Sequence, residues 1–276
     1  IHLNSIAPPK KTMWTGEGKN PVALMRTSWT DPNAIYVAMK GGSVSVNHAH
    51  MDVGSFVMDA DGVRWAMDFG MQEYESLESK GLQIFGRTQD AQRWTVFRYS
   101  NLVHNTITVN GLQQRVTGYA PITGSSSATS FMDAITDLTA VYKGAVAKAN
   151  RGIAIVDQQY VVVRDEIQAL DTPTTIRWTL LTRASVKITG ENTAELTKDG
   201  KKLFLRAQSP AKITMKTWST DPPNSYDAPN PGTIMIGFEL KIPAGTSTVS
   251  TVELIPEKAI NNANKKILPL QDWNEQ

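Results

Sequence analysis

The sequence predicts an all-β protein, folded as one large antiparallel β-sandwich (a supersandwich) over residues 1–276. Short runs of alternating or β-branched residues recur along the chain, and Gly, Pro, Asn and Asp separate them. No internal repeat points to a solenoid or a propeller. With 41% hydrophobic residues in 276 positions, the chain can bury a large core.

The first half contains clear strand patterns at residues 34–39, 55–60, 63–68 and 106–110. Asp61-Gly62 lies between two of these runs and predicts an antiparallel hairpin, because this dipeptide favours a tight turn between strands. The second half is almost entirely strands and turns, with runs at 152–156, 160–164, 174–182, 184–189, 203–206, 213–218, 233–240 and 248–254.

Three segments depart from the strand pattern. Residues 75–98 lack alternation, and one or two short helices are expected there. The compositions of residues 123–130, rich in Ser and Thr, and of residues 221–232, rich in Pro and Asn, predict loops.

Charge and composition exclude several classes of protein. The net charge is only +2, so a global basic field that would recruit nucleic acid is absent. Cysteine is absent, which leaves His, Asp and Glu as the candidate metal ligands. No apolar run approaches the roughly 20 residues that span a bilayer. Because the chain starts at Ile1, we expect a processed product or a piece of a longer protein.

Imidazole and carboxylate groups concentrate in three short segments. If residues 44–49 run extended, His48 and His50 share one face, and long-range pairing could bring Asp68 and His104 beside them. Two imidazoles and one carboxylate with water make an ordinary zinc set. An isolated His-x-His pair is more often part of a half-buried strand with hydrogen-bonded histidines.

A cupin-like metalloenzyme is a minor alternative. Gly42 followed by His48-Ala49-His50 matches the opening of the cupin metal motif, but the expected Glu is replaced by Gly54 or Ser55. Glycoside hydrolysis needs two facing carboxylates, and the presence of Asp52 and Asp68 does not require that arrangement.

A longer series of motifs resembles the C-terminal β-domain of the heparinase II/III-like polysaccharide lyases. The resemblance covers about residues 20–185, and its order and spacing are far more specific than His-x-His alone. The matching segments are Asn47 to Phe56, Asp61-Gly62, Asp68-Phe69-Gly70 with Tyr74, Ser100 to Thr106 with Asn110-Gly111, Asp137 to Arg151, and Tyr160 to Asp165.

The resemblance implies a role for each residue of the cluster. His48 would lie at the catalytic cleft, while His50, Asp68 and His104 would hold one zinc ion that is chiefly structural. Asn47, Asp52, Tyr74 and Asn105 are candidates to contact substrate or to orient these groups, although aromatic and Asn residues at strand ends more often serve packing or turns.

The resemblance also implies an activity, a partner domain and a location. Such enzymes cleave uronate-containing acidic polysaccharides by β-elimination, with a Tyr base on an N-terminal α/α-toroid that this chain does not contain. A periplasmic or secreted location is expected. The competing class is a noncatalytic module in which zinc staples strands and the surface binds glycan or a partner domain.

Overall fold

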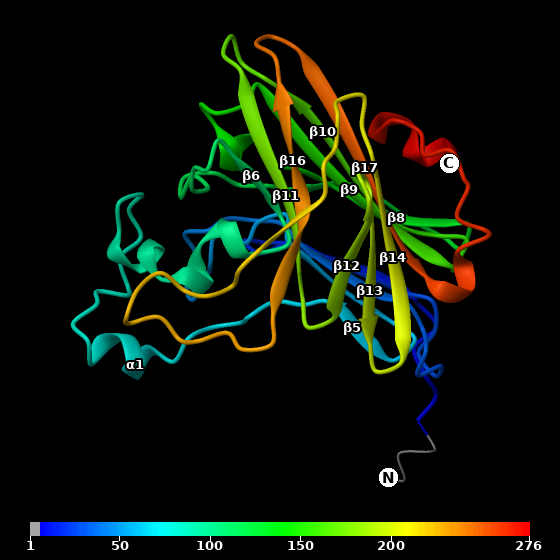
Figure 1. Ribbon diagram of the computed structural model, residues 1–276, viewed down its shortest axis with the longest axis horizontal. Helices are drawn as coiled ribbons and strands as arrows, with labels where there is room; N and C mark the ends of the chain where they lie inside the picture. The colour runs from blue at the N-terminus through cyan, green and yellow to red at the C-terminus, as the bar shows by residue number, and fades with distance from the viewer. Residues whose placement is uncertain (1–5) are drawn as a thin grey trace.

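Three antiparallel sheets form the described part of the chain, residues 6–276 of the computed structural model (Figure 1). The five-stranded sheet has the order β1 (Met13–Gly16), β2 (Val22–Arg26), β3 (Tyr36–Lys40), β4 (Phe56–Ala60), β5 (Val63–Ala66). The eight-stranded sheet has the order β12 (Ser185–Gly190), β13 (Thr193–Lys198), β14 (Lys201–Gln208), β17 (Ser247–Pro256), β10 (Tyr160–Gln168), β9 (Lys148–Val156), β8 (Phe131–Asp137), β7 (Ile122–Ala128). The four-stranded sheet has the order β15 (Lys216–Trp218), β16 (Ile234–Ile242), β11 (Thr174–Thr182), β6 (Ile107–Val109). The all-β sandwich class predicted from the sequence is confirmed.

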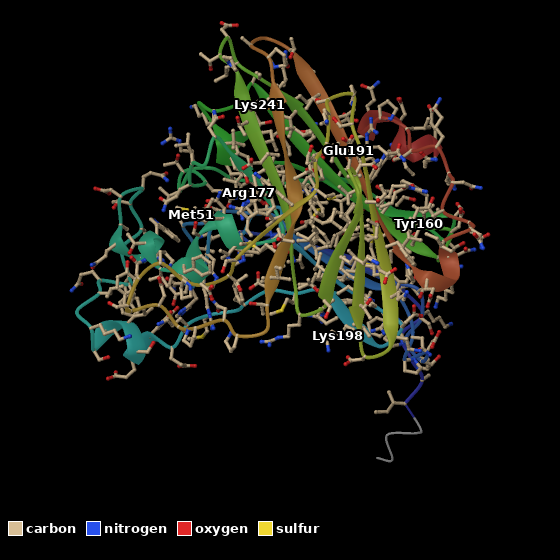
Figure 2. All side chains as sticks on the ribbon, in the orientation of Figure 1. Met51, Tyr160, Arg177, Glu191, Lys198 and Lys241 are labelled. Atoms are coloured by element: carbon tan, nitrogen blue, oxygen red, sulfur yellow. The ribbon has the colours of Figure 1, made fainter. Side chains whose placement is uncertain are left out.

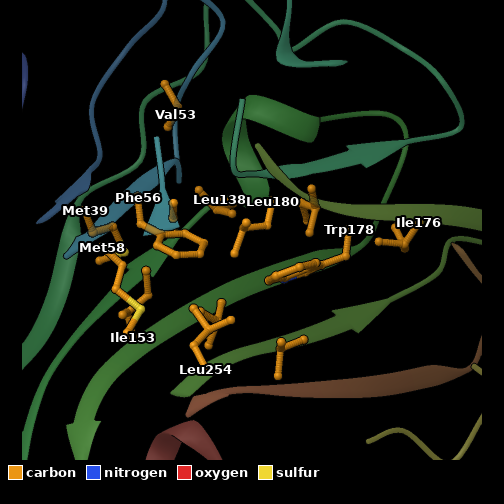
Figure 3. Packing of buried hydrophobic residues seen from close by; sticks show 14 of the residues in the cluster. Met39, Val53, Phe56, Met58, Leu138, Ile153, Ile176, Trp178, Leu180 and Leu254 are labelled. Carbon is orange, nitrogen blue, oxygen red and sulfur yellow. The ribbon is translucent and has the colours of Figure 1, made fainter. Parts of the chain in front are cut away.

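One apolar cluster joins the three sheets. Met58 of the five-stranded sheet, Ile153 of the eight-stranded sheet and Trp178 of the four-stranded sheet all belong to it, and each is at most 1% exposed (Figure 3). Charged side chains such as Lys198 and Lys241 instead project near the ends of their strands (Figure 2). The hydrophobic effect on these inward faces therefore holds the sheets together, at about 25 cal/mol per Å² of apolar surface buried.

The predicted hairpin is present. β4 pairs with β5 in antiparallel fashion, and the connecting Asp61 and Gly62 both have positive φ angles, 54° and 76°. Two central residues in this conformation match the right-handed twist of the flanking strands. Asn110 and Gly111 repeat the conformation, with φ angles of 52° and 67°.

The predicted loop at residues 123–130 is wrong, because most of it forms β7 at the edge of the eight-stranded sheet. Ser125, Ser126 and Ser127 pair with β8 residue by residue, although their side chains bury little apolar surface. Backbone hydrogen bonds to a well-formed neighbour therefore outweigh weak strand propensity here. β1, β2, β8 and β13 were not predicted either.

The short helices expected within residues 75–98 are confirmed. They are α1 (Tyr74–Glu78), η2 (Gln92–Thr95) and η3 (Phe97–Tyr99), and further single turns are η4 (Asn101–Val103), η5 (Thr139–Tyr142), η6 (Glu257–Ala259) and η7 (Leu270–Glu275). Across residues 6–276, no helix has the length and apolar character needed to cross a membrane.

The predicted loop at residues 221–232 is also confirmed, and it lies along the helical segment (Figure 1). Asp227 accepts a hydrogen bond from the Phe97 backbone at 2.9 Å, and Asn230 accepts one from Arg98 at 2.9 Å. Gln72 donates to the Tyr226 carbonyl at 2.8 Å. The loop thus fastens the segment that carries Tyr74 to the four-stranded sheet.

Candidate functional site

Three chain segments meet at the candidate site. The loop between β3 and β4 carries His48 and His50, the end of β5 leads into Asp68, and the turn η4 leads into His104 just before β6. All three lie where the five-stranded sheet meets the four-stranded sheet, since the Met67 backbone donates to the Leu181 carbonyl at 3.0 Å. Long-range strand pairing therefore assembles three of the residues that the sequence grouped, His50, Asp68 and His104.

Asn105 locks this junction. It is fully buried, and its side-chain amide donates to the carbonyls of Phe56 and Met67, both at 2.8 Å, while its oxygen accepts from the Leu181 backbone at 2.6 Å. One side chain thus satisfies backbone groups of both sheets. Asn105 positions the strands beside His104, and its buried amide has no free contact to offer a substrate.

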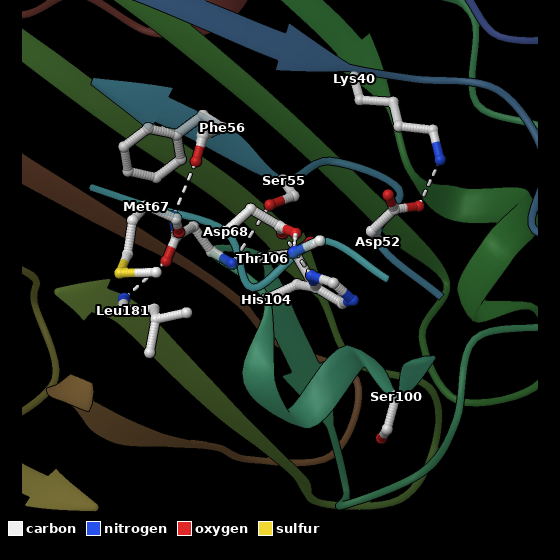
Figure 4. A network of polar contacts seen from close by, with 12 residues as sticks. Lys40, Asp52, Ser55, Phe56, Met67, Asp68, Ser100, His104, Thr106 and Leu181 are labelled. Atoms are coloured by element: carbon white, nitrogen blue, oxygen red, sulfur yellow. Dashed lines mark hydrogen bonds and ion pairs between the residues drawn. The ribbon is translucent and has the colours of Figure 1, made fainter. Parts of the chain in front are cut away.

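Asp68 and His104 are in direct contact. Oδ2 of Asp68 lies 2.6 Å from Nδ1 of His104, and Oδ1 of Asp68 accepts from the Gly70 backbone at 2.7 Å (Figure 4). The ring of His50 lies 5.6 Å from that of His104, centroid to centroid. His104 and His50 are 1% and 8% exposed, so the pair of imidazoles is shielded from water.

Burial and charge set the protonation of this cluster. Burial, aided by His104, lowers the pKa of His50 to about 4, so His50 is a neutral imidazole at pH 7. Burial also acts to lower the pKa of His104, but the Asp68 carboxylate outweighs it and the pKa of His104 is raised. Burial acts to raise the pKa of Asp68, but His104 outweighs it and that pKa is lowered. Asp68 is therefore an anion.

The donor set fits a zinc ion in its chemistry. Neutral His50 and ionised Asp68 are in the forms that bind zinc, whereas His104 would have to release the proton that Asp68 favours. Nε2 of His104 is buried and has no hydrogen-bond partner among residues 6–276. A buried polar atom normally has a partner, and a metal ion could serve as one here. In the same range, however, no three such side chains already stand in a metal-holding cluster. Zinc therefore stays a prediction.

His48 has a separate environment. The structure places turns at residues 44–48, so the expected extended run is wrong, and His48 does not share a strand face with His50. His48 has a φ angle of 58°, in the left-handed region, and its side chain is exposed while His50 is buried. Nδ1 of His48 lies 2.8 Å from the Tyr74 hydroxyl, and the two rings stack at 5.8 Å.

Arg93 supports the turn between the two histidines, a role that the sequence did not reveal. Its guanidinium is 5% exposed, donates to the Ala49 carbonyl at 2.7 Å and lies 5.4 Å from the Tyr99 ring. The Tyr99 ring in turn stacks on His50 at 4.3 Å. An Arg in a sequence usually indicates a solvated surface, and nothing local marks this one as buried.

Asn47 and Asp52 have partners other than the histidines. Asn47 accepts a hydrogen bond from Arg87, and Asp52 forms an ion pair with Lys40. In the described part of the chain, Asp52 makes no hydrogen bond to His50, so the structure does not place it as an acceptor for that ring. Its negative charge still acts on His50, raising the pKa against the effect of burial.

A buried ion pair between Arg151 and Asp165 holds two backbone segments next to the site. Both side chains of Arg151 and Asp165 are fully buried, and they form two parallel hydrogen bonds of 2.7 and 2.9 Å. Arg151 also donates to the carbonyls of Gly54 and Asn105, each at 2.9 Å. One guanidinium therefore ties the eight-stranded sheet to the loop after His50 and to the residue after His104.

Residues 22–253 match the family model described as heparinase II/III-like, C-terminal. The chain belongs to this family. The match covers the whole candidate site and replaces the cupin alternative. A comparison with curated proteins finds no match.

Solved structures share the fold of this heparinase II/III-like domain. A heparinase III structure has a TM-score of 0.71 at 14% identity, covering 91% of this chain and 37% of that one. The heparinase III BT4657 gene product has a TM-score of 0.69 at 18% identity, covering 94% of this chain and 38% of that one. The heparan sulfate lyase HepC from Pedobacter heparinus has 0.68 at 15% identity, with 90% and 37% covered. The chain thus spans well under half the length of these proteins.

Proposed function

We propose that this chain is the β-domain of a polysaccharide lyase that cleaves an acidic, uronate-containing polysaccharide by β-elimination. It would supply His48 to the cleft and hold one structural zinc ion with His50, Asp68 and His104. The observation that carries the proposal is the separation of the histidines. One is exposed and paired with a tyrosine, and two are buried with a carboxylate.

β-Elimination needs three groups. A base takes the C5 proton of the uronate, whose bonding electrons form the C4–C5 double bond as the C4–O bond breaks. A partner neutralises the adjacent carboxylate, and an acid protonates the leaving oxygen. His48 is suited to the proton steps because imidazole titrates near neutrality.

Tyr74 gives His48 a defined proton arrangement. When the Tyr74 hydroxyl donates to Nδ1, Nε2 carries the proton and acts as an acid or a hydrogen-bond donor. In the other tautomer Nδ1 donates to the hydroxyl, and Nε2 is free to accept a proton. The stacked ring holds the imidazole plane in either case.

The zinc ion, when bound, would fix His50, Asp68 and His104 and so brace the loop beneath His48. The proton steps remain with the side chains of the cleft. The usual base of such lyases is a Tyr on an α/α-toroid, so we propose such a helical domain as the partner that completes the site. A periplasmic or secreted location fits a polysaccharide substrate.

The test is the ultraviolet absorbance of the unsaturated uronate product. The chain alone, and a longer protein with its helical domain, are mixed with heparan sulfate, chondroitin sulfate and alginate. We expect the absorbance to rise with the longer protein, and His48→Ala to slow that rise by about 10²–10⁴-fold, the usual contribution of acid–base catalysis.

Two results would count against the proposal. A longer protein that leaves all three polysaccharides intact would favour a noncatalytic, zinc-stapled module. An active protein that tolerates His48→Ala would show that the cleft histidine has been misassigned. His48→Gln is the control for side-chain size.

A further inference from the structure

A polar cleft adjoins the loop that ends at His48. It has a volume of about 580 Å³, within the usual range for small-molecule sites, and the loop at residues 43–47 forms one wall. Lys19 and Asn20, from the β1–β2 connection, lie on it together with Arg87 and Tyr119. Asn47, the neighbour of His48 in the chain, belongs to this lining.

The charge of this cleft is entirely positive. Lys19 and Arg87 both line it, and no Asp or Glu does. Within residues 6–276, neither cation forms an ion pair, whereas nearby Lys40 is paired with Asp52. Among the described residues, Arg87 donates a side-chain hydrogen bond only to the neutral amide of Asn47. Two cations without a carboxylate partner favour an anionic ligand.

The remaining lining groups suit an oxygen-rich ligand. The hydroxyls of Ser43 and Ser45 lie 3.4 Å apart on one wall, and the Tyr119 hydroxyl is fixed by donating to the Gly18 carbonyl at 2.8 Å. Hydroxyl and amide groups exchange hydrogen bonds with sugar hydroxyls. The Arg87 guanidinium can bind a carboxylate or a sulfate through two parallel hydrogen bonds.

We propose that this cleft is a subsite for one acidic sugar residue, held by Arg87 and Lys19 beside the sugar that His48 contacts. The assignment rests on the proposed lyase function, because a polyanionic chain that reaches His48 has its next acidic residue close by. Arg87 is bonded to Asn47, so the subsite and the His48 loop share a contact.

The test is calorimetric titration of the chain with two tetrasaccharides, one of sulfated heparan sulfate and one of unsulfated heparosan, which carries only carboxylates. The test variant is Arg87→Gln with Lys19→Gln. The control variant is Lys187→Gln with Lys241→Gln, two exposed lysines outside the cleft. Figure 2 labels Lys241. We expect the test variant to bind about tenfold or more weakly than the control, which is at least 1.4 kcal/mol.

The two oligosaccharides separate the chemistries. Weaker binding of both assigns a carboxylate to the subsite, and weaker binding of the sulfated one alone assigns a sulfate. Arg87→Lys, which keeps the charge but loses the paired hydrogen bonds, should lie between wild type and Arg87→Gln. Equal affinities of test and control variants, or no binding by the wild type, would overturn the subsite. The absorbance assay of His48→Ala decides the lyase proposal separately.

Discussion

The buried pair of Arg151 and Asp165 gives the sharpest prediction about how the fold supports the site. Asp165→Asn keeps the shape of the side chain but removes its charge, and leaves the guanidinium buried without a counterion. Both side chains are fully buried, and the two hydrogen bonds between them are 2.7 and 2.9 Å long. Breaking such a pair from one side typically costs about 3–5 kcal/mol.

That cost is a large share of the whole stability, since domains unfold with about 5–15 kcal/mol. The assay is urea denaturation of the chain followed by circular dichroism, with the free energy of unfolding taken by linear extrapolation. Glu239→Gln is the matched control, because it removes a carboxylate from the Lys216 pair, whose side chains are 44% and 39% exposed. We expect at most about 1 kcal/mol there.

A second variant separates charge from positioning. Arg151→Met also removes the bonds to the Gly54 and Asn105 carbonyls, so it should weaken zinc binding as well as stability, whereas Asp165→Asn leaves those bonds in place. Equal effects of Asp165→Asn and Glu239→Gln on the unfolding free energy would refute the reasoning. Unchanged zinc affinity in a folded Arg151→Met protein would refute the link to the site.

Three further predictions concern the site and the core. Purified protein should carry about one zinc ion by elemental analysis, and His104→Ala should lose it while His48→Ala keeps it. The reverse pattern would show that His104 is not a zinc ligand and that His48 is one. Tyr74→Phe keeps the stacked ring but removes the hydroxyl, so kcat of the active lyase should fall about tenfold with KM little changed. A raised KM with unchanged kcat would indicate a role in substrate binding instead. Burial raises the pKa of Asp133 to about 7, so the folded state holds a proton that the unfolded state releases above about pH 4. The free energy of unfolding of the wild type should therefore fall by up to roughly 4 kcal/mol between pH 4 and 7. Denaturation at several pH values should show no such fall for Asp133→Asn, whereas the control Asp171→Asn, at an exposed position, should keep it.

The strands that could be predicted are those in which side-chain pattern and burial agree. Residues 174–182 form β11 with the predicted bounds because most of that strand lies in the core. β7 could not be predicted, since its Ser-rich side chains carry no apolar alternation and the strand is stabilised by backbone pairing with β8. The pattern of apolar residues in a sequence shows which side chains are buried. It shows which backbones pair only where pairing and burial coincide.

The site divides in the same way. The concentration of His and Asp in three short segments marked His50, Asp68 and His104 as candidates. The support from Arg93 and Arg151 was not visible, since a buried guanidinium depends on carbonyls and carboxylates far along the chain. Ala49, for example, is 44 positions from Arg93. Such partners are brought together only by the completed sheets.

The separate environments of His48 and His50 follow from the backbone rather than from their spacing. An extended run would point both rings to one side, where both would be buried or both exposed. The left-handed conformation of His48 instead turns its ring out to Tyr74, at a cost of roughly 1–2 kcal/mol for a residue with a side chain. The Arg93 hydrogen bond to Ala49, in the next position, and the Tyr99 ring on His50 offset that cost. Gly at position 48 would adopt the turn more easily but would lack the imidazole. The left-handed turn therefore leaves His48 exposed beside Tyr74, while His50 is buried beside His104.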